Sequence, residues 1–311
     1  MNYFQGGVWP VMITPFTKSN HIDYEGLRQL VEWYIENGVN GLFAVCQSSE
    51  MFELNLNERV LLAAKVKEYV AGRIPVIASG HISDDLEEQI SELNAISKTG
   101  VDAVILITNR MAQENEGDDV WIQRTQYLID HIAPHVKLGL YECPYPYKRL
   151  MSEKTIRWCI NTGRFYFLKD TSSDIDNLKM KLNICAESKL KLYNANTATL
   201  LDSLHLGAYG YCGVMANIHP RLYNILYDNR NNRAVQELSE FLTISALIER
   251  QCYPLNAKYY LQLEGVPIEL KSRLQETKAL TKTYKKEVEM LKELSDIVEI
   301  EWGIKHEKKD I

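Results

Sequence analysis

The sequence predicts an α/β fold: a (β/α)₈ TIM barrel with a C-terminal helical extension. Short apolar runs alternate with longer stretches in which apolar residues recur every three or four positions. A short phrase recurs at two helix-to-strand junctions, 37–43 and 99–105. After Pro220 the strand signals stop and only helical patterns remain.

The apolar runs are the predicted strands. They are rich in valine and isoleucine, as strands buried on both faces of a parallel sheet are. The predicted strands are Val11–Thr14, Gly41–Val45, Pro75–Ser79, Ala103–Ile107, Lys137–Tyr141, Phe165–Lys169, Lys191–Asn194 and Ala208–Val214.

The stretches between the strands are predicted helices. One begins after Asp23 and ends at Asn37-Gly38, a typical helix end. A second begins at Asn55, with Glu58 completing a capping box, and a third begins at Ser83. Others are expected at about 119–132, 152–162, 174–186 and 197–206. A doubly wound open sheet is the alternative, but the first strand lacks a glycine-rich phosphate turn.

The chain is expected to divide into a barrel, residues 1–222, and a C-terminal helical region, residues 223–311, packed on it. Helices are predicted at 222–227, 234–249, 257–263 and 270–294. The polar end, Lys305–Ile311, is expected to fray.

Composition narrows the class of protein. The chain has 311 residues, 46% of them hydrophobic, and a net charge of −6, which gives no support for nucleic-acid binding. We see no signal peptide and no run long enough for a membrane helix. Six scattered cysteines without CxxC or zinc-finger spacing favour buried, reduced thiols in a cytoplasmic protein.

The chemistry of such a barrel is expected at the carboxyl ends of its strands. Lys169 ends the apolar strand 165–169. Burial disfavours the charged form of an amine, and only a neutral amine attacks a carbonyl carbon. By itself, a lysine at a strand end is more often a solvated surface group.

Other polar groups follow neighbouring strands. Tyr141 ends the preceding strand and could move protons beside Lys169, or simply pack there. Ser48 and Ser49 precede a helix and suit a carboxylate, although they equally suit an ordinary cap.

Together these strand ends resemble the family of dihydrodipicolinate synthase and N-acetylneuraminate lyase. The similarity extends from Gly7 to about Pro267 and rests on five segments in the family's order. They are Gly7–Phe16; Gln47-Ser48-Ser49-Glu50 with Leu54-Asn55 and Glu58-Arg59; Tyr141 with Pro144; Leu168-Lys169-Asp170-Thr171-Ser172; and Gly207, Gly210, Gly213, Ala216-Asn217 and Pro220.

The resemblance implies a lyase or aldolase that forms a Schiff base between Lys169 and pyruvate or another 2-keto acid, with Tyr141 carrying the proton. It implies no metal and no organic cofactor, and an assembly of two or four copies. The expected substrate-binding residues are Gln47, Ser48, Ser49, Arg110, Asn196 and Cys212.

Several positions depart from the family pattern. Gln47 stands where the resemblance places a proton-relay threonine, and Met111 where it places a tyrosine borrowed from a neighbouring subunit. Tyr145 or Pro146 replaces the arginine that would hold the synthase's aldehyde substrate, and Val214 replaces a serine of the sialate lyases. These departures disfavour both of the familiar activities.

Three hypotheses follow. The first is a carbon–carbon lyase acting on some other 2-keto acid, with Arg110 binding a distal carboxylate or hydroxyl, unless it forms a surface ion pair instead. The second is a barrel that binds a 2-keto acid without turnover, and the third is a genuine 4-hydroxy-tetrahydrodipicolinate synthase. Glu142 is expected to point away from the barrel interior and to be structural, because side chains alternate along a strand.

Overall fold

The strands of the computed structural model, which describes residues 4–304, form one parallel sheet in the order β1-β8-β7-β6-β5-β4-β3-β2. They are β1 (Gly7–Val8), β2 (Leu42–Phe43), β3 (Val76–Ala78), β4 (Ala103–Ile107), β5 (Leu138–Tyr141), β6 (Phe165–Asp170), β7 (Lys191–Asn194) and β8 (Gly210–Tyr211). The predicted (β/α)₈ barrel is therefore confirmed.

The first strand differs from the prediction, which placed it at Val11–Thr14. Its first part, β1, pairs with β8, and the Trp9 amide donates to the Tyr211 carbonyl. Beyond Pro10 the chain turns to β2, where Val11 forms a parallel bridge with Phe43. Because proline has no amide hydrogen to donate, the hydrogen-bond ladder with β8 is interrupted there. The segment before Pro10 pairs with β8 and the segment after it pairs with β2, which closes the barrel.

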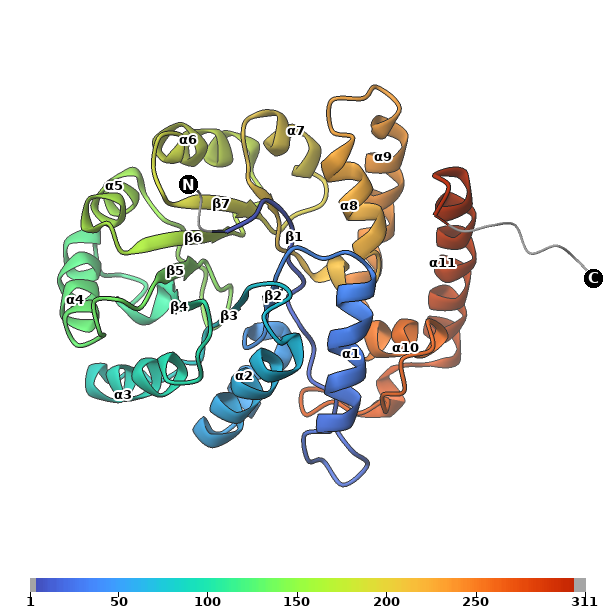
Figure 1. Cartoon of the computed structure of the whole chain (residues 1–311), viewed down its shortest axis with the longest axis horizontal. Coiled ribbons are helices and arrows are strands. Elements are labelled where there is room, and N and C mark those ends of the chain that lie inside the picture. The colour runs from blue at the N-terminus through green and yellow to red at the C-terminus, as the bar shows by residue number, and fades with distance from the viewer. Residues whose placement is uncertain (1–3, 305–311) are drawn as a thin grey trace, which may run out of the picture.

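Helices α1 to α8 surround the strands (Figure 1). They are α1 (Tyr24–Glu36), α2 (Leu56–Val70), α3 (Leu86–Ser97), α4 (Asp118–Asp130), α5 (Glu153–Thr162), α6 (Ile175–Cys185), α7 (Leu200–His205) and α8 (Pro220–Asp228). The predicted capping box of Asn55 and Glu58 is present. The third helix begins three residues later than predicted because Asp85, rather than Ser83, caps it by accepting from the amides of Glu87 and Glu88.

Short 3₁₀ turns follow several strands and connect other elements. They are η1 (Gln47–Ser49), η2 (Met51–Glu53), η3 (Thr108–Arg110), η4 (Val214–Asn217), η5 (Ala246–Arg250) and η6 (Thr277–Ala279). The predicted last strand extended to Val214, but the chain already enters η4 there.

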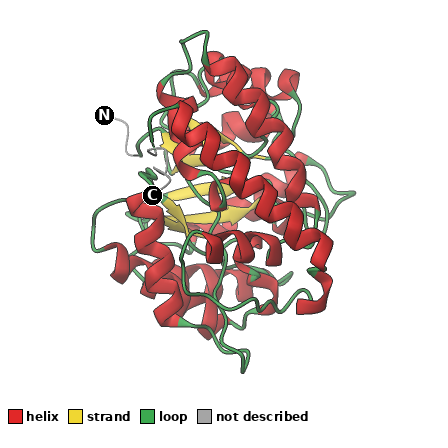
Figure 2. Cartoon of the chain, turned by 90° about the vertical axis from the view of Figure 1, so that its right-hand side faces the viewer, coloured by secondary structure: helices red, strands yellow, loops and turns green. Residues whose placement is uncertain are grey.

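The C-terminal region contributes α9 (Val235–Ser245), α10 (Leu255–Leu263) and α11 (Lys282–Glu301). They lie on the outer side of α8 and α1 (Figure 1), so that in the view from this side helices stand in front of the strands (Figure 2). The boundary predicted after residue 222 falls inside α8, so we propose that this region begins after Asp228. The expected fraying of Lys305–Ile311 lies outside the described residues.

The helix predicted at 270–294 is wrong in its first half. Residues 271–276 are irregular because the backbone amides of Arg273 and Leu274 are bonded to the carboxylate of Glu50. The helix begins only after Thr281, whose hydroxyl accepts from the Tyr284 amide, and it continues to Glu301.

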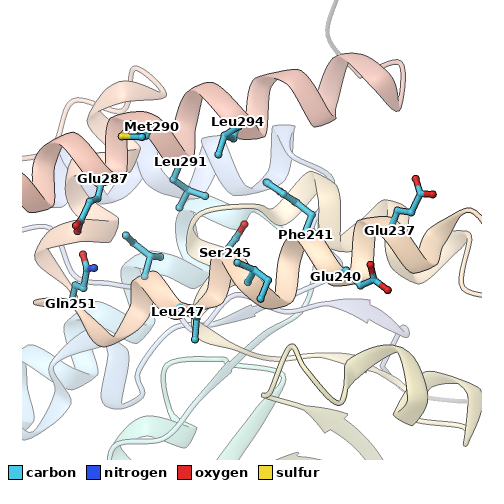
Figure 3. A pocket seen from close by; sticks show the side chains of 12 residues that line it. Glu237, Glu240, Phe241, Ser245, Leu247, Gln251, Glu287, Met290, Leu291 and Leu294 are labelled. Atoms are coloured by element: carbon cyan, nitrogen blue, oxygen red, sulfur yellow. The ribbon is translucent and has the colours of Figure 1, made fainter.

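An apolar groove of about 700 Å³ lies between α11 and the segment formed by α9 and η5 (Figure 3). Phe241, Leu247, Met290 and Leu294 are among the side chains that line it.

The six cysteines are all free thiols. Within residues 4–304, no helix combines the length and the apolar character needed to cross a membrane.

Candidate active site

Tyr141 is the last residue of β5, and Lys169 is the last but one of the adjacent strand β6. They are register partners on β5 and β6, and both side chains are almost fully buried. The Lys169 Nζ lies 4.2 Å from the centroid of the Tyr141 ring and 5.8 Å from that of Phe43. Within the described part of the chain, the Lys169 amine forms no ion pair. The neighbours of this amine are therefore aromatic faces rather than carboxylates.

A buried ion-pair cluster lies behind this pair. The Lys181 ammonium, from α6, is 2.5 Å from Glu142 Oε1 and 2.5 Å from Asp170 Oδ2, and all three side chains are fully buried. Glu142 and Asp170 are the residues that follow Tyr141 and Lys169 on the chain. Glu142 points away from the barrel interior, as expected, and the cluster ties the two strand ends together.

A cavity of about 460 Å³ opens above Lys169. Its walls come from the η1 turn, the ends of β5 and β6, the loops after β7 and β8, and the C-terminal region. The lining residues are Gln47, Ser48, Tyr141, Pro144, Lys148, Lys169, Thr171, Ser173, Ala195, Asn196, Gly213, Val214, Glu249, Arg250, Tyr253, Pro254 and Leu274.

The Tyr141 hydroxyl points to the amide of Gln47, donating to its Oε1 over 3.4 Å. Burial raises the pKa of Tyr141 well above its usual value, and the nearby Cys143 adds to this effect. The phenol is therefore protonated at neutral pH. Its partner is an amide oxygen, which accepts a hydrogen bond but does not pass a proton on.

The two serines of η1 have different environments. Ser48 lines the cavity, whereas Ser49 is fully buried beneath it. The Ser49 hydroxyl accepts from the Cys46 amide and donates to the Cys46 carbonyl, each over 2.7 Å. The Ser49 hydroxyl thus closes the turn, and the substrate contact expected of it stays a prediction.

Arg110 and Cys212, which are expected to bind the substrate, are not among the residues that line the cavity. The Arg110 guanidinium is 2.6 Å from the Asp84 carboxylate and lies over the Phe52 ring. Cys212 is fully buried, and burial raises its pKa to about 12, although the charge of Lys169 opposes this shift. Arg110 is thus used in an ion pair, and Cys212 belongs to the packing around Lys169.

The polar residues after β7 are mostly structural. Asn196 lines the cavity. Asn194 is buried and donates to Thr199 and Ser203, and Thr197 is bonded to the hydroxyls of two tyrosines of the last barrel unit. Of these three residues, only Asn196 is at the cavity.

The structure also shows the surroundings of positions at or near the departures from the family pattern. The Met111 side chain is fully buried within its own chain. The Tyr145 ring is half exposed and packs against Phe52, with 4.8 Å between ring centroids. Lys148 lines the cavity and donates to the Thr171 carbonyl over 2.8 Å.

The sequence did not point to Glu249, Arg250 and Tyr253, which form one wall of the cavity. Burial raises the pKa of Tyr253, and a hydrogen bond with Ser48 partly offsets this shift. These residues follow a helix far beyond the last strand, and no spacing motif marks them. The position of Tyr253-Pro254 at a helix start was the only signal available.

Glu50 joins the η1 turn to the C-terminal region. Its buried carboxylate accepts from the Lys258 ammonium over 3.1 Å, the Ser272 hydroxyl over 2.9 Å and the Arg273 amide over 2.6 Å. Its backbone is left-handed, with φ of 62°. One carboxylate therefore holds the cavity's serine turn against the segment that supplies the opposite wall.

Comparison with known proteins adds to this geometry. The model of the Dihydrodipicolinate synthetase family matches residues 4–294. A 4-hydroxy-tetrahydrodipicolinate synthase of Staphylococcus saprophyticus is 28% identical over 265 residues, which are 82% of this chain and 84% of that protein. One from Methanococcus maripaludis is 28% identical over 266 residues, 84% of this chain and 86% of its own length.

Solved structures share the fold at lower identity. YagE from Escherichia coli K12, a prophage protein of the dihydrodipicolinic acid synthase family in complex with pyruvate, has a TM-score of 0.83 and 19% identity over 94% of this chain and 98% of its own. CdNal from Clostridium difficile, in complex with mannosamine, has a TM-score of 0.82 and 18% identity over 93% of this chain and 99% of its own.

Proposed function

The chain belongs to the dihydrodipicolinate synthetase family, a family of carbon–carbon lyases and synthases, and we propose that it acts on pyruvate or another 2-keto acid through an imine on Lys169. One observation carries the proposal. Lys169 and Tyr141 are register partners that line the same cavity, with the ammonium nitrogen 4.2 Å from the phenol ring. A nucleophile and a proton donor side by side are what imine formation needs.

In the proposed reaction, the Lys169 amine attacks the ketone carbon of the 2-keto acid to give a carbinolamine. Tyr141 donates the proton that allows the hydroxyl to leave as water. The protonated imine then withdraws electrons from the bond between C3 and C4 of the substrate. That bond can be broken or formed while the keto acid stays attached to the chain.

We further propose that the Ser48 hydroxyl receives the substrate carboxylate and that Gln47 and Asn196 bind the remaining polar atoms. All three residues line the cavity. Hydrogen bonds from neutral donors to a carboxylate are charge-assisted and set the orientation of the keto group over the amine.

By family resemblance, we also propose an assembly of two or four copies, which light scattering can test.

Two alternatives each have a specific observation in their favour. The curated relatives are 4-hydroxy-tetrahydrodipicolinate synthases, which favours that activity. The hydrogen bond from Tyr141 to the Gln47 amide favours a barrel that binds a keto acid without turnover, because the phenol is not connected to a proton relay. Substrate assays distinguish these two from a lyase of different specificity.

The test is reductive trapping. The protein is incubated with pyruvate and reduced with borohydride. Its intact mass is measured by mass spectrometry, and the modified peptide is then identified. We expect one adduct on Lys169, absent from Lys169→Ala. Lys191→Ala is the matched control, because Lys191 begins the neighbouring strand β7, at the opposite end of the barrel. No adduct with pyruvate or with any other small 2-keto acid contradicts the proposal.

A further inference from the structure

Glu249 places a carboxylate in the cavity that contains Lys169. The side chain is half-buried, and within residues 4–304 its carboxylate has no hydrogen-bond or ion-pair partner. Removing a carboxylate from water costs free energy unless a partner compensates. A carboxylate that is half-buried and unpaired on the wall of a cavity is available to a bound molecule.

The η5 segment fixes the direction in which Glu249 points. Leu247 of this segment, and Gln251 directly after it, line the apolar groove beneath α11 (Figure 3). Glu249 and Arg250 line the cavity above Lys169 instead. One five-residue turn thus has its apolar side in the groove and its charged side at the candidate active site.

Cleavage next to a hydroxyl needs a base at that hydroxyl. When the bond between C3 and C4 of a 4-hydroxy-2-keto acid breaks, the C4 hydroxyl must lose its proton as C4 becomes an aldehyde. Tyr141 is bonded to the Gln47 amide oxygen, and Met111 is buried away from the cavity. Neither position continues a proton path from Tyr141, so a separate acceptor at the C4 hydroxyl would let cleavage proceed without that path.

We propose that Glu249 is a catalytic acid–base residue that takes the proton from the C4 hydroxyl of a 4-hydroxy-2-keto acid held as an imine on Lys169. The inference rests on the proposed function and assigns a further catalytic residue to it. The C4 oxygen becomes a carbonyl oxygen, the C3–C4 bond breaks, and its electron pair moves through C2 to the iminium nitrogen, leaving an enamine. C3 of the enamine then takes a proton from water and Glu249 returns its proton to water. Hydrolysis of the imine by water releases pyruvate and the free lysine. In the direction of synthesis, Glu249 returns the proton to the alkoxide.

The electrostatic surroundings suit this role. Burial raises the pKa of Glu249, while Arg250 and Lys169 oppose the shift. The negative charge of Glu249 also raises the pKa of three tyrosines, Tyr211, Tyr223 and Tyr253. Lys148 lines the same cavity. A base must be deprotonated to act, so cleavage should fall as the pH drops through the pKa of Glu249 and this acid limb should disappear in Glu249→Gln.

The experiment compares wild type, Glu249→Gln and Glu237→Gln. Glu237 is an exposed glutamate of α9, outside the cavity, and so is the matched control. Each protein is assayed for the borohydride-trapped pyruvate adduct and for deuterium exchange into the pyruvate methyl group. Cleavage of 4-hydroxy-2-oxoglutarate and 2-keto-3-deoxygluconate is followed by pyruvate release across the pH range.

We expect Glu249→Gln to keep the adduct and the methyl exchange but to lose cleavage by about 10²- to 10⁴-fold, and Glu237→Gln to match wild type. Retention of the adduct also shows that the variant is folded. Cleavage by Glu249→Gln within about twofold of wild type overturns the inference. So does loss of the adduct together with cleavage, or a wild type that traps pyruvate but cleaves neither acid. A wild type that traps no keto acid instead contradicts the proposed function itself.

Discussion

Tyr141 and Lys169 are held in register by the residues that follow them. Glu142 and Asp170 both bond to the Lys181 ammonium over 2.5 Å, so a single buried cation joins the ends of β5 and β6. The distance of 4.2 Å between the Lys169 Nζ and the centroid of the Tyr141 ring is therefore fixed by the two strands, and both groups line the cavity. Four predictions follow from this site and its supports.

Replacing Tyr141 with phenylalanine should slow imine formation without unfolding the protein. The ring would keep its packing against Phe43, at 5.6 Å between centroids, but would have no proton for the carbinolamine. We expect the rate of borohydride trapping with pyruvate to fall by roughly 10²- to 10⁴-fold. Tyr145→Phe, at an exposed tyrosine, is the control. A wild-type rate in Tyr141→Phe excludes the proposed role of the hydroxyl.

Replacing Lys181 with methionine should strongly destabilise the fold. The change leaves Glu142 and Asp170 as two carboxylates in a site with no solvent access. Removing one partner of a buried ion pair costs about 3–5 kcal/mol of the free energy of unfolding. Urea denaturation measures this loss, and Lys179→Met, at an exposed lysine of the same helix, should change little. Equal stability of the two variants would show that the cluster is not a structural clamp.

Acid should destabilise the protein through His81. Its Nε2 accepts from the Ile107 amide over 2.5 Å and its Nδ1 faces Gln89 Oε1, so the folded protein holds the neutral ring. Burial lowers the pKa of His81 to about 4 from its ordinary value of 6.5. The unfolded chain therefore binds a proton that the folded chain does not, and stability is lost as the pH falls from 6.5 to 4. The expected loss is roughly 3 kcal/mol.

The difference in unfolding free energy between neutral and acidic pH checks the His81 prediction. His81→Gln should be less stable at neutral pH but should lack this contribution to the acid slope. His135→Gln, at an exposed histidine, should keep the slope. If His81→Gln shows the same slope as wild type, other groups cause the acid sensitivity.

Arg110→Ala should leave substrate binding unchanged. The guanidinium is paired with Asp84 and is not among the residues lining the cavity. We expect the pyruvate concentration for half-maximal trapping to stay at its wild-type value in Arg110→Ala. Ser48→Ala should raise it by roughly 10- to 150-fold, because a hydrogen bond to a charged group contributes about 1.5–3 kcal/mol. A rise in Arg110→Ala equal to that in Ser48→Ala would restore the arginine to the site.

The barrel was predictable because its signals are local and repeated. The phrase at 37–43 and 99–105 is a helix end followed by a strand, and its shared glycine has a left-handed backbone in both copies. The φ angle is 77° at Gly38 and 81° at Gly100, a region that favours glycine. By contrast, Val11–Thr14 was misplaced as the first strand because two halves of one segment pair with different neighbours, which no local pattern reveals.

The placement of Lys169 beside Tyr141 was also predictable, since parallel strands bring their carboxyl ends to one edge. The loop residues were not, because hydrogen bonds that the sequence does not disclose decide where a side chain points. Ser49 bonds to Cys46, and Arg110 is paired with Asp84. Glu249 was missed because only the packing of the C-terminal helices brings it over the barrel.

The wall formed by Glu249, Arg250, Tyr253 and Pro254 belongs to no strand of the barrel. The amine and the phenol are anchored in β5 and β6, where a changed residue disturbs the core. The wall residues come from the short segment between α9 and α10. Over evolutionary time, a barrel of this kind can therefore keep its covalent chemistry intact while its descendants exchange one small turn and, with it, the molecules on which they act.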